Sequence, residues 1–188
     1  MNNLPIRTII LHCAATRPSM DIGLKEITSW HKQRGFTSCG YHFIIRRDGT
    51  IETGRQVTQQ GAHALNYNRH SIGICLVGGV TEHNVNVPED NFTPAQYTAL
   101  NQLLDKLLTE HKGADIIGHN GLSGHTTRGC PSFNWRSYKK FILLAHEATY
   151  RPDDWADHTI YDWHKFYADS WQIPATFYDA LELIPDRG

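Results

Sequence analysis

The chain has 188 residues and a mass of 21.4 kDa, the size of one ordinary domain with a short appendage. Hydrophobic residues make up 40% and charged residues 20%, which excludes a disordered or a fibrous protein. The formal net charge of −1 provides no basic field for nucleic acid, and no apolar run reaches the roughly 20 residues of a membrane helix.

The N-terminal part of the chain predicts a strand, a helix and a β-hairpin, in that order. Residues 6–12 form a short run rich in β-branched side chains, which is typical of a buried strand. Apolar side chains at helical spacing over residues 22–34 predict an amphipathic helix. Two further predicted strands, over residues 39–46 and 50–53, flank an Asp-Gly pair, a strong signal for a hairpin turn.

The next elements alternate strands with helices. A strand is predicted over residues 71–77, and Thr93-Pro94-Ala95-Gln96 is a capping box that opens a leucine-rich helix stopping at Gly113. A last core strand over residues 115–119 precedes a helix that begins at Asn134. This alternation predicts an α/β domain with a mixed central β-sheet flanked by helices, because the hairpin adds an antiparallel strand.

The composition changes near residue 150. Residues 151–188 hold eight acidic and three basic side chains, a net charge of −5, which leaves +4 on residues 1–150. The same segment holds eight aromatic residues, among them Trp155, Trp163 and Trp171. Since so short a segment is too small for a core of its own, we expect a main domain over residues 1–150. Residues 151–188 are predicted to be an extension that packs on this domain or on a partner.

Three candidate metal ligands lie at or after the ends of predicted strands, where α/β domains often place their chemistry. His12 ends the first strand, His119 ends the last, and Cys130 follows eleven residues later. Neutral imidazole and thiolate suit Zn²⁺, and three protein ligands with an open fourth position are typical of a catalytic zinc site. A histidine at a strand end is also a common structural residue, so this pattern alone leaves both interpretations open.

Several motifs become specific when they are taken together. The longest is Gly-Tyr-His-Phe-Ile-Ile-Arg-Arg-Asp-Gly-Thr over residues 40–50. The others are Leu11–Pro18, Gly61–Ala64, Asn68–Cys75, Phe92–Gln96, Gly118-His119 and Cys130–Phe133. In order and spacing, over about residues 6–145, they closely resemble the zinc-dependent N-acetylmuramoyl-L-alanine amidase family, which includes T7-type phage lysozymes and peptidoglycan recognition proteins.

The resemblance implies a cofactor and a reaction. His12, His119 and Cys130 match the zinc ligands of the family, which implies one Zn²⁺ per chain. Tyr41 matches a tyrosine with a catalytic role beside the metal, and His63 matches a histidine by the substrate groove. The reaction implied is hydrolysis of the amide between the lactyl group of N-acetylmuramic acid and L-alanine of the peptidoglycan stem peptide. Zinc suits this reaction because it acidifies water and polarises a carbonyl.

One position departs from the family pattern. Phage members often carry lysine two residues before the ligand cysteine, where this chain has Arg128. Because arginine stays charged and cannot donate a proton near neutral pH, we expect Arg128 to act as an electrostatic clamp on the oxyanion. The proton for the leaving amine would then come from the metal's water, from Tyr41 or from a nearby histidine. His125, in a loop longer than in the T7-type enzyme, is either a solvated residue or a local acid/base.

Other histidines and cysteines receive structural interpretations. His42 alternates with Tyr41, so we expect it on the other face of the sheet in a hydrogen-bonded role. Cys13 is expected to point away from His12 and into packing. His31 falls in helical, polar surroundings and is expected to face solvent.

The expected partner is peptidoglycan, and we expect a monomer that binds neither membrane nor nucleic acid. Two alternatives stay open. Some members of the family recognise peptidoglycan without cutting it, usually after losing the cysteine ligand that is present here as Cys130. T7-type lysozymes also bind and inhibit a phage RNA polymerase, which makes polymerase a second possible partner.

The N-terminus lacks the charged-then-apolar layout of a secretory signal, so we expect production in the cytoplasm and action on the cell wall after release. A phage endolysin that acts in host lysis fits this best. An effector injected into a rival's periplasm and a wall-recycling amidase are the other settings considered.

Overall fold

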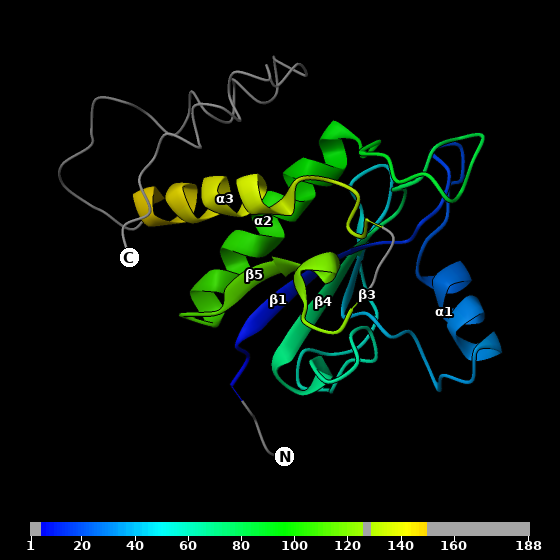
Figure 1. The fold of residues 1–188 in the computed structure, drawn as a ribbon. Helices are drawn as coiled ribbons and strands as arrows, with labels where there is room; N and C mark the ends of the chain where they lie inside the picture. The colour runs from blue at the N-terminus through cyan, green and yellow to red at the C-terminus, as the bar shows by residue number, and fades with distance from the viewer. Residues whose placement is uncertain (1–4, 126–128, 150–188) are drawn as a thin grey trace. The chain divides into compact units, whose positions relative to one another are not determined.

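The computed structural model describes residues 5–125 and 129–149 of the chain (Figure 1). The chain divides into two compact units. The first ends at Trp135, and the second begins at Arg136 and contains most of helix α3 (Trp135–Thr149). The predicted extension over residues 151–188 lies outside the described residues. Within the described ranges, no helix is long and apolar enough to span a bilayer.

The first unit is built on a five-stranded mixed sheet in the order β3-β2-β4-β1-β5. Strand β1 pairs in parallel with both β4 and β5, β2 pairs in parallel with β4, and β3 runs antiparallel to β2. The predicted mixed sheet is therefore confirmed, with the Asp-Gly hairpin supplying its antiparallel edge. The strands are β1 (Thr8–Cys13), β2 (Phe43–Ile45), β3 (Ile51–Thr53), β4 (Ser71–Leu76) and β5 (Asp115–Gly118).

Strand β2 is shorter than the predicted strand over residues 39–46. The reason is that the His42 side chain replaces a backbone carbonyl as a hydrogen-bond acceptor. The imidazole Nδ1 of His42 accepts a hydrogen bond from the Gly73 N–H at 2.9 Å, in the place of a carbonyl of the ladder. Its Nε2 lies 2.9 Å from the Gln59 carbonyl oxygen, and the side chain is fully buried. The predicted structural role of His42 is confirmed.

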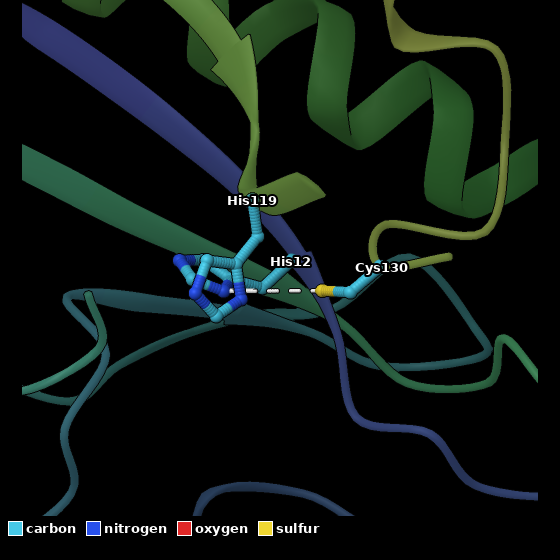
Figure 2. A group of neighbouring side chains, drawn as sticks. All are labelled: His12, His119 and Cys130. Carbon is cyan, nitrogen blue, oxygen red and sulfur yellow. Dashed lines mark hydrogen bonds between the residues drawn. The ribbon is translucent and has the colours of Figure 1, made fainter. Parts of the chain in front are cut away.

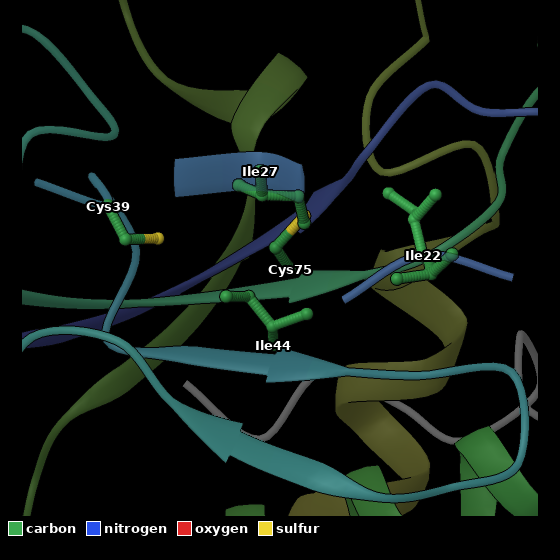
Figure 3. Close-up of a cluster of buried hydrophobic side chains, with 6 residues drawn as sticks. Ile22, Ile27, Cys39, Ile44 and Cys75 are labelled. Carbon is green, nitrogen blue, oxygen red and sulfur yellow. The ribbon is translucent and has the colours of Figure 1, made fainter. Parts of the chain in front are cut away.

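Helices α1 (Leu24–Gln33) and α2 (Pro94–Glu110) lie on opposite sides of the strands (Figures 1 and 3). The predicted capping box opens α2: the Thr93 hydroxyl accepts from the Gln96 N–H, and the Thr93 N–H donates to the Gln96 side-chain oxygen. The amide nitrogen of the fully buried Gln96 donates to the carbonyls of Ile45 and Val77, which ties the start of α2 to the sheet.

The side of the sheet that carries α1 has a small apolar core (Figure 3). Ile27 of α1 packs there with Ile44 of β2 and Cys75 of β4, and Ile22, Cys39 and Val77 complete the cluster. Since side chains alternate along a strand, the register that pairs His12 with Cys75 places both on this same face. The α1 face of the sheet therefore continues directly into the candidate site.

The register also brings the two candidate histidines together. Leu11 of β1 pairs with Gly118, the last residue of β5, so His12 and His119 follow paired positions on adjacent parallel strands. Carboxyl ends of parallel strands meet at one edge of a sheet, which is where α/β folds usually bind ligands. A 3-10 turn, η2 (His119–Gly121), begins at this edge, and another, η1 (Asn68–His70), leads into β4.

Candidate metal centre

Three predicted ligands from three separate segments converge at this edge (Figure 2). His12 lies near the end of β1, His119 begins η2, and Cys130 comes from the loop that follows. Their ligand atoms all lie within 4.8 Å of one another, and Nδ1 of His12 is 4.0 Å from the Cys130 sulfur. His12 is buried and the other two are half-buried. The structure thus brings together all three residues that the sequence nominated as ligands.

Backbone contacts hold the cysteine loop against the strands. The Asn120 N–H donates to the Cys130 carbonyl at 2.9 Å, and the Cys13 N–H points at the Cys130 sulfur at 3.3 Å. The Asn120 side chain accepts from the Trp135 indole N–H at 2.8 Å. Gly118 allows this arrangement, because a Cβ at that position would overlap the indole ring.

The electrostatics of the group suit a divalent cation. Burial first, and then the neighbouring His63 and His119, hold the pKa of His12 well below its ordinary value. Burial and His125 lower the pKa of His119 to about 4. Both imidazoles are therefore neutral at neutral pH, the form that binds metal. A hydrogen bond with Cys13, together with burial, raises the pKa of Cys130, so a thiolate there calls for a compensating cation. Two neutral imidazoles and a thiolate fit Zn²⁺.

A chain of hydrogen bonds behind His12 fixes which of its nitrogens is free. Ser71 donates its hydroxyl proton to the Tyr67 carbonyl at 2.8 Å, so its oxygen meets Nε2 of His63, 3.4 Å away, as an acceptor. With a proton on that Nε2, Nδ1 of neutral His63 accepts from Nε2–H of His12, at 3.0 Å. This leaves the lone pair on Nδ1 of His12, the atom that faces Cys130.

His63 therefore lies directly behind a candidate ligand. Its ring packs edge-on against His12, with centroids 5.0 Å apart, and lies over Gly73, where a Cβ would collide with it. The Asn68 side-chain oxygen accepts from the backbone N–H groups of His63 and Ala64, which holds this loop in place. Burial lowers the pKa of His63 to about 3. The predicted contact of His63 with substrate stays a prediction.

Tyr41 also packs against His12, with ring centroids 5.1 Å apart, and its ring centroid is 6.4 Å from that of His63. Burial raises the pKa of Tyr41 well above the ordinary value, so the phenol keeps its proton and is able to donate a hydrogen bond. His31 packs beside it at 5.3 Å, and the expectation that His31 faces solvent is wrong. Its side chain is only 4% exposed, because Nδ1 accepts the Gly40 N–H at 2.8 Å and fixes the segment that carries Tyr41.

The sequence did not predict that Cys13 and Ser132 lie beside the candidate ligand Cys130. Cys13 is buried as expected, but it does not point clear of the site: its sulfur is 3.3 Å from the Ser132 hydroxyl, and its thiol interacts with Cys130. These contacts arise because Cys13 is the last residue of β1, where the cysteine loop folds over the strand end.

The loop between His119 and Cys130 is described only in part. The predicted oxyanion clamp, Arg128, lies outside the described residues. His125 is described, and it is not a solvated loop residue. Its Nδ1 lies 3.0 Å from Nε2 of His119, and the predicted role of His125 as a local acid/base stays a prediction.

Comparison with known proteins agrees with the class that the fold and site define. The family model described as N-acetylmuramoyl-L-alanine amidase matches residues 2–133. The chain is 45% identical over 141 residues to the endolysin of Klebsiella phage KP32, covering 73% of this chain and 90% of that one. It is also 45% identical over 130 residues to the endolysin of Escherichia phage T7, covering 69% and 83%.

Solved structures give the same result. The amidase LysC from Clostridium intestinale is 31% identical and superposes with a TM-score of 0.62, covering 75% of this chain and 87% of that one. Drosophila PGRP-LB, at 24% identity and a TM-score of 0.53 over 68% and 75% of the chains, shares the fold. The protein is thus an α/β protein with the fold that amidases and PGRP-LB share. Among proteins of this fold, the chain belongs to the N-acetylmuramoyl-L-alanine amidase family.

Proposed function

We propose that this protein is a zinc-dependent N-acetylmuramoyl-L-alanine amidase that acts as a phage endolysin on the peptidoglycan of the host. The observation that carries the proposal is the convergence of His12, His119 and Cys130 at the carboxyl edge of the sheet. Retention of the cysteine favours an enzyme over a module that only recognises peptidoglycan. Similarity to phage endolysins along most of their length supports the proposed setting.

The bond to be broken is an amide, which resists hydrolysis at neutral pH. His12, His119 and Cys130 would hold Zn²⁺, which supplies an acidified water and a Lewis acid for the carbonyl. Water adds its oxygen to the lactyl carbonyl carbon, the C–N bond breaks, and the products are a lactyl carboxylate and a free α-amino group on L-alanine. The protein's own residues must therefore stabilise negative charge on the carbonyl oxygen and deliver a proton to the amine.

Two side chains are proposed to stabilise the oxyanion, and the proton for the leaving amine would come from the attacking water, from Tyr41 or from a nearby histidine. Tyr41 keeps its phenolic proton and lies beside His12, so it suits the donation of a hydrogen bond to the developing oxyanion. Arg128 carries a fixed positive charge two residues before the cysteine ligand in the sequence, which suits a clamp on the same oxygen. His63 is proposed to support His12 from behind and to border the substrate groove.

The proposal is tested with purified sacculi and the full-length protein. We expect about one zinc per chain by metal analysis, and release of stem peptides that begin with a free L-alanine amine. Cys130→Ser should lose zinc and release no peptide, whereas Cys39→Ser, which alters a buried cysteine outside the trio, should keep both. New reducing sugar ends without new amines would identify a glycosidase instead. Zinc without peptide release would identify a recognition module.

A further inference from the structure

His125 links a candidate ligand to a backbone carbonyl. One ring nitrogen, Nδ1, lies 3.0 Å from Nε2 of His119, and the other, Nε2, lies 3.0 Å from the Leu65 carbonyl oxygen. A carbonyl oxygen only accepts, so Nε2 of His125 carries a proton. In the neutral form of this ring Nδ1 is an acceptor, to which His119 donates from Nε2–H. The lone pair of His119 is left on Nδ1, as it is on His12.

The position of His125 is fixed by more than this one chain of hydrogen bonds. Its backbone N–H donates to the Leu122 carbonyl at 3.2 Å, and Leu122 is buried against Ile10 and Ala64. Its ring packs on His119 with centroids 4.9 Å apart and meets Tyr67 edge-on at 5.7 Å. The imidazole is therefore held from three sides rather than placed by a single contact.

The anchor of His125 belongs to the same loop as the anchor of His63. Leu65 exposes 74% of its side chain, yet its carbonyl accepts from His125. Two residues later, the Tyr67 carbonyl ends the chain of hydrogen bonds that runs through Ser71 and His63 to His12. Both histidines of the trio are thus oriented by relays of the same design that end on one loop.

We propose that His125 is a positioning residue for the metal centre, which holds His119 in the tautomer and orientation that present Nδ1 to the ion. The inference rests on the proposed function, because it concerns the same metal. It goes beyond that function by adding a residue outside the three ligands and by giving the loop around Leu65 a part in metal binding. Partners of this kind often change metal affinity 10- to 100-fold when they are removed.

The test separates packing from hydrogen bonding with two substitutions. His125→Phe keeps an aromatic ring of similar size but cannot accept from His119, whereas His125→Asn keeps an acceptor near the position of Nδ1. His83→Phe alters an exposed histidine outside the trio and serves as the matched control. Zinc affinity is measured by competition with a chromophoric chelator. The orientation of the ligands is followed by the visible and thiolate charge-transfer bands of the Co²⁺-loaded protein.

We expect His125→Phe to weaken zinc binding about 10- to 100-fold and to shift the Co²⁺ bands, with His125→Asn within several-fold of the wild type. His83→Phe should change neither measurement. Equal zinc affinity and an unchanged Co²⁺ spectrum in His125→Phe would overturn the inference, as would an Asn variant as weak as the Phe variant. A wild-type protein that binds no zinc would overturn the proposed function as well, so the two failures are told apart.

Discussion

The imidazole of His63 lies against that of His12, with Nδ1 of the first 3.0 Å from Nε2 of the second, and Gly73 makes room for it. Gly73 lies in the fully buried strand β4, and a Cβ at this position would collide with the His63 ring. The absence of a side chain at Gly73 is therefore tied to the presence of one at His63.

This relationship predicts a coupled pair of substitutions. Gly73→Ala should destabilise the protein by about 1–3 kcal/mol through overpacking and should weaken zinc binding by displacing His63. His63→Ala opens the space that the new methyl group needs. The double variant should therefore be more stable than the sum of the single effects predicts, by about 0.5–3 kcal/mol. Urea unfolding of the four proteins in a double-mutant cycle measures this coupling, and simple additivity would contradict it.

Metal removal should act on stability as well as on catalysis. A ligand that binds only the folded state adds stability by mass action, about 2.7 kcal/mol at a free concentration 100 times its dissociation constant. Chelation should therefore lower the melting temperature and abolish peptide release, and added Zn²⁺ should restore both. In Cys130→Ser the melting temperature should no longer respond to Zn²⁺. A response equal to that of the wild type would place the ion elsewhere.

Tyr41 should matter for turnover more than for metal binding. Tyr41→Phe keeps the ring that packs between His12 and His31 but removes the hydroxyl donor. Loss of one oxyanion donor typically costs about 10²- to 10³-fold in kcat. We expect a loss of that order in peptide release, with zinc affinity within about twofold of the wild type. A large loss of zinc affinity with kcat preserved in the loaded enzyme would show that the tyrosine is structural.

Acid should destabilise the protein partly through His31. Burial, with Arg34 and Arg55 nearby, lowers the pKa of His31 to about 4, below its ordinary 6.5. Between these two values the unfolded chain binds a proton that the folded chain does not, so this contribution is complete above pH 6.5 and is lost as the pH falls towards 4. His31→Asn keeps an acceptor for the Gly40 N–H but cannot titrate.

We expect the unfolding free energy of His31→Asn to depend less steeply on pH in the acid range than that of the wild type. The slope of unfolding free energy against pH between 4 and 6.5 should fall by up to about 1.4 kcal/mol per pH unit, the value of one proton. Urea unfolding at a series of pH values, with chelator present so that metal release does not contribute, measures this slope. Some slope should remain, because the pKa of His42 and that of His63 are also lowered by burial. An unchanged slope would mean that His31 titrates normally in the folded protein.

Gln96 should contribute more to the stability of the protein than an ordinary helix-capping residue does. It is fully buried, and its side chain both closes the capping box with Thr93 and donates to two carbonyls at the ends of β2 and β4. Gln96→Leu leaves those carbonyls without this donor and should cost about 1–3 kcal/mol. Gln102→Leu, at an exposed position of the same helix, is the matched control and should stay within about 0.5 kcal/mol. Equal effects of the two substitutions would contradict this assignment.

The sequence predicted the elements that carry a strong local signal. Periodicity located β1, α1, β4 and β5 within a few residues, and the box at Thr93 located the start of α2. The trio was predicted because the motifs around it resemble the amidase family, and its placement near the ends of two predicted strands, which left both interpretations open by itself, agrees with their meeting at one edge of the sheet. In each case local pattern and tertiary structure point the same way.

The features that could not be predicted depend on contacts between residues far apart in the chain, which leave no periodic pattern in the sequence. His31 looks like a polar helix position, and only its distance to the Gly40 N–H shows why it is buried. His125 lies in an irregular loop, and its two partners are six and sixty residues away in the chain. Strand β2 was predicted too long because the sequence does not show that the His42 side chain would replace a backbone partner.

Both imidazoles of the metal centre depend for their orientation on the one loop that contains Leu65 and Tyr67. Since the relays behind both imidazoles end on this loop, a nick or a displacement there would release the two histidines in one event. We therefore expect opening of this loop to accompany loss of the metal, and exchange of the amide protons of His63 and Ala64, which are bonded to Asn68, would report on that opening.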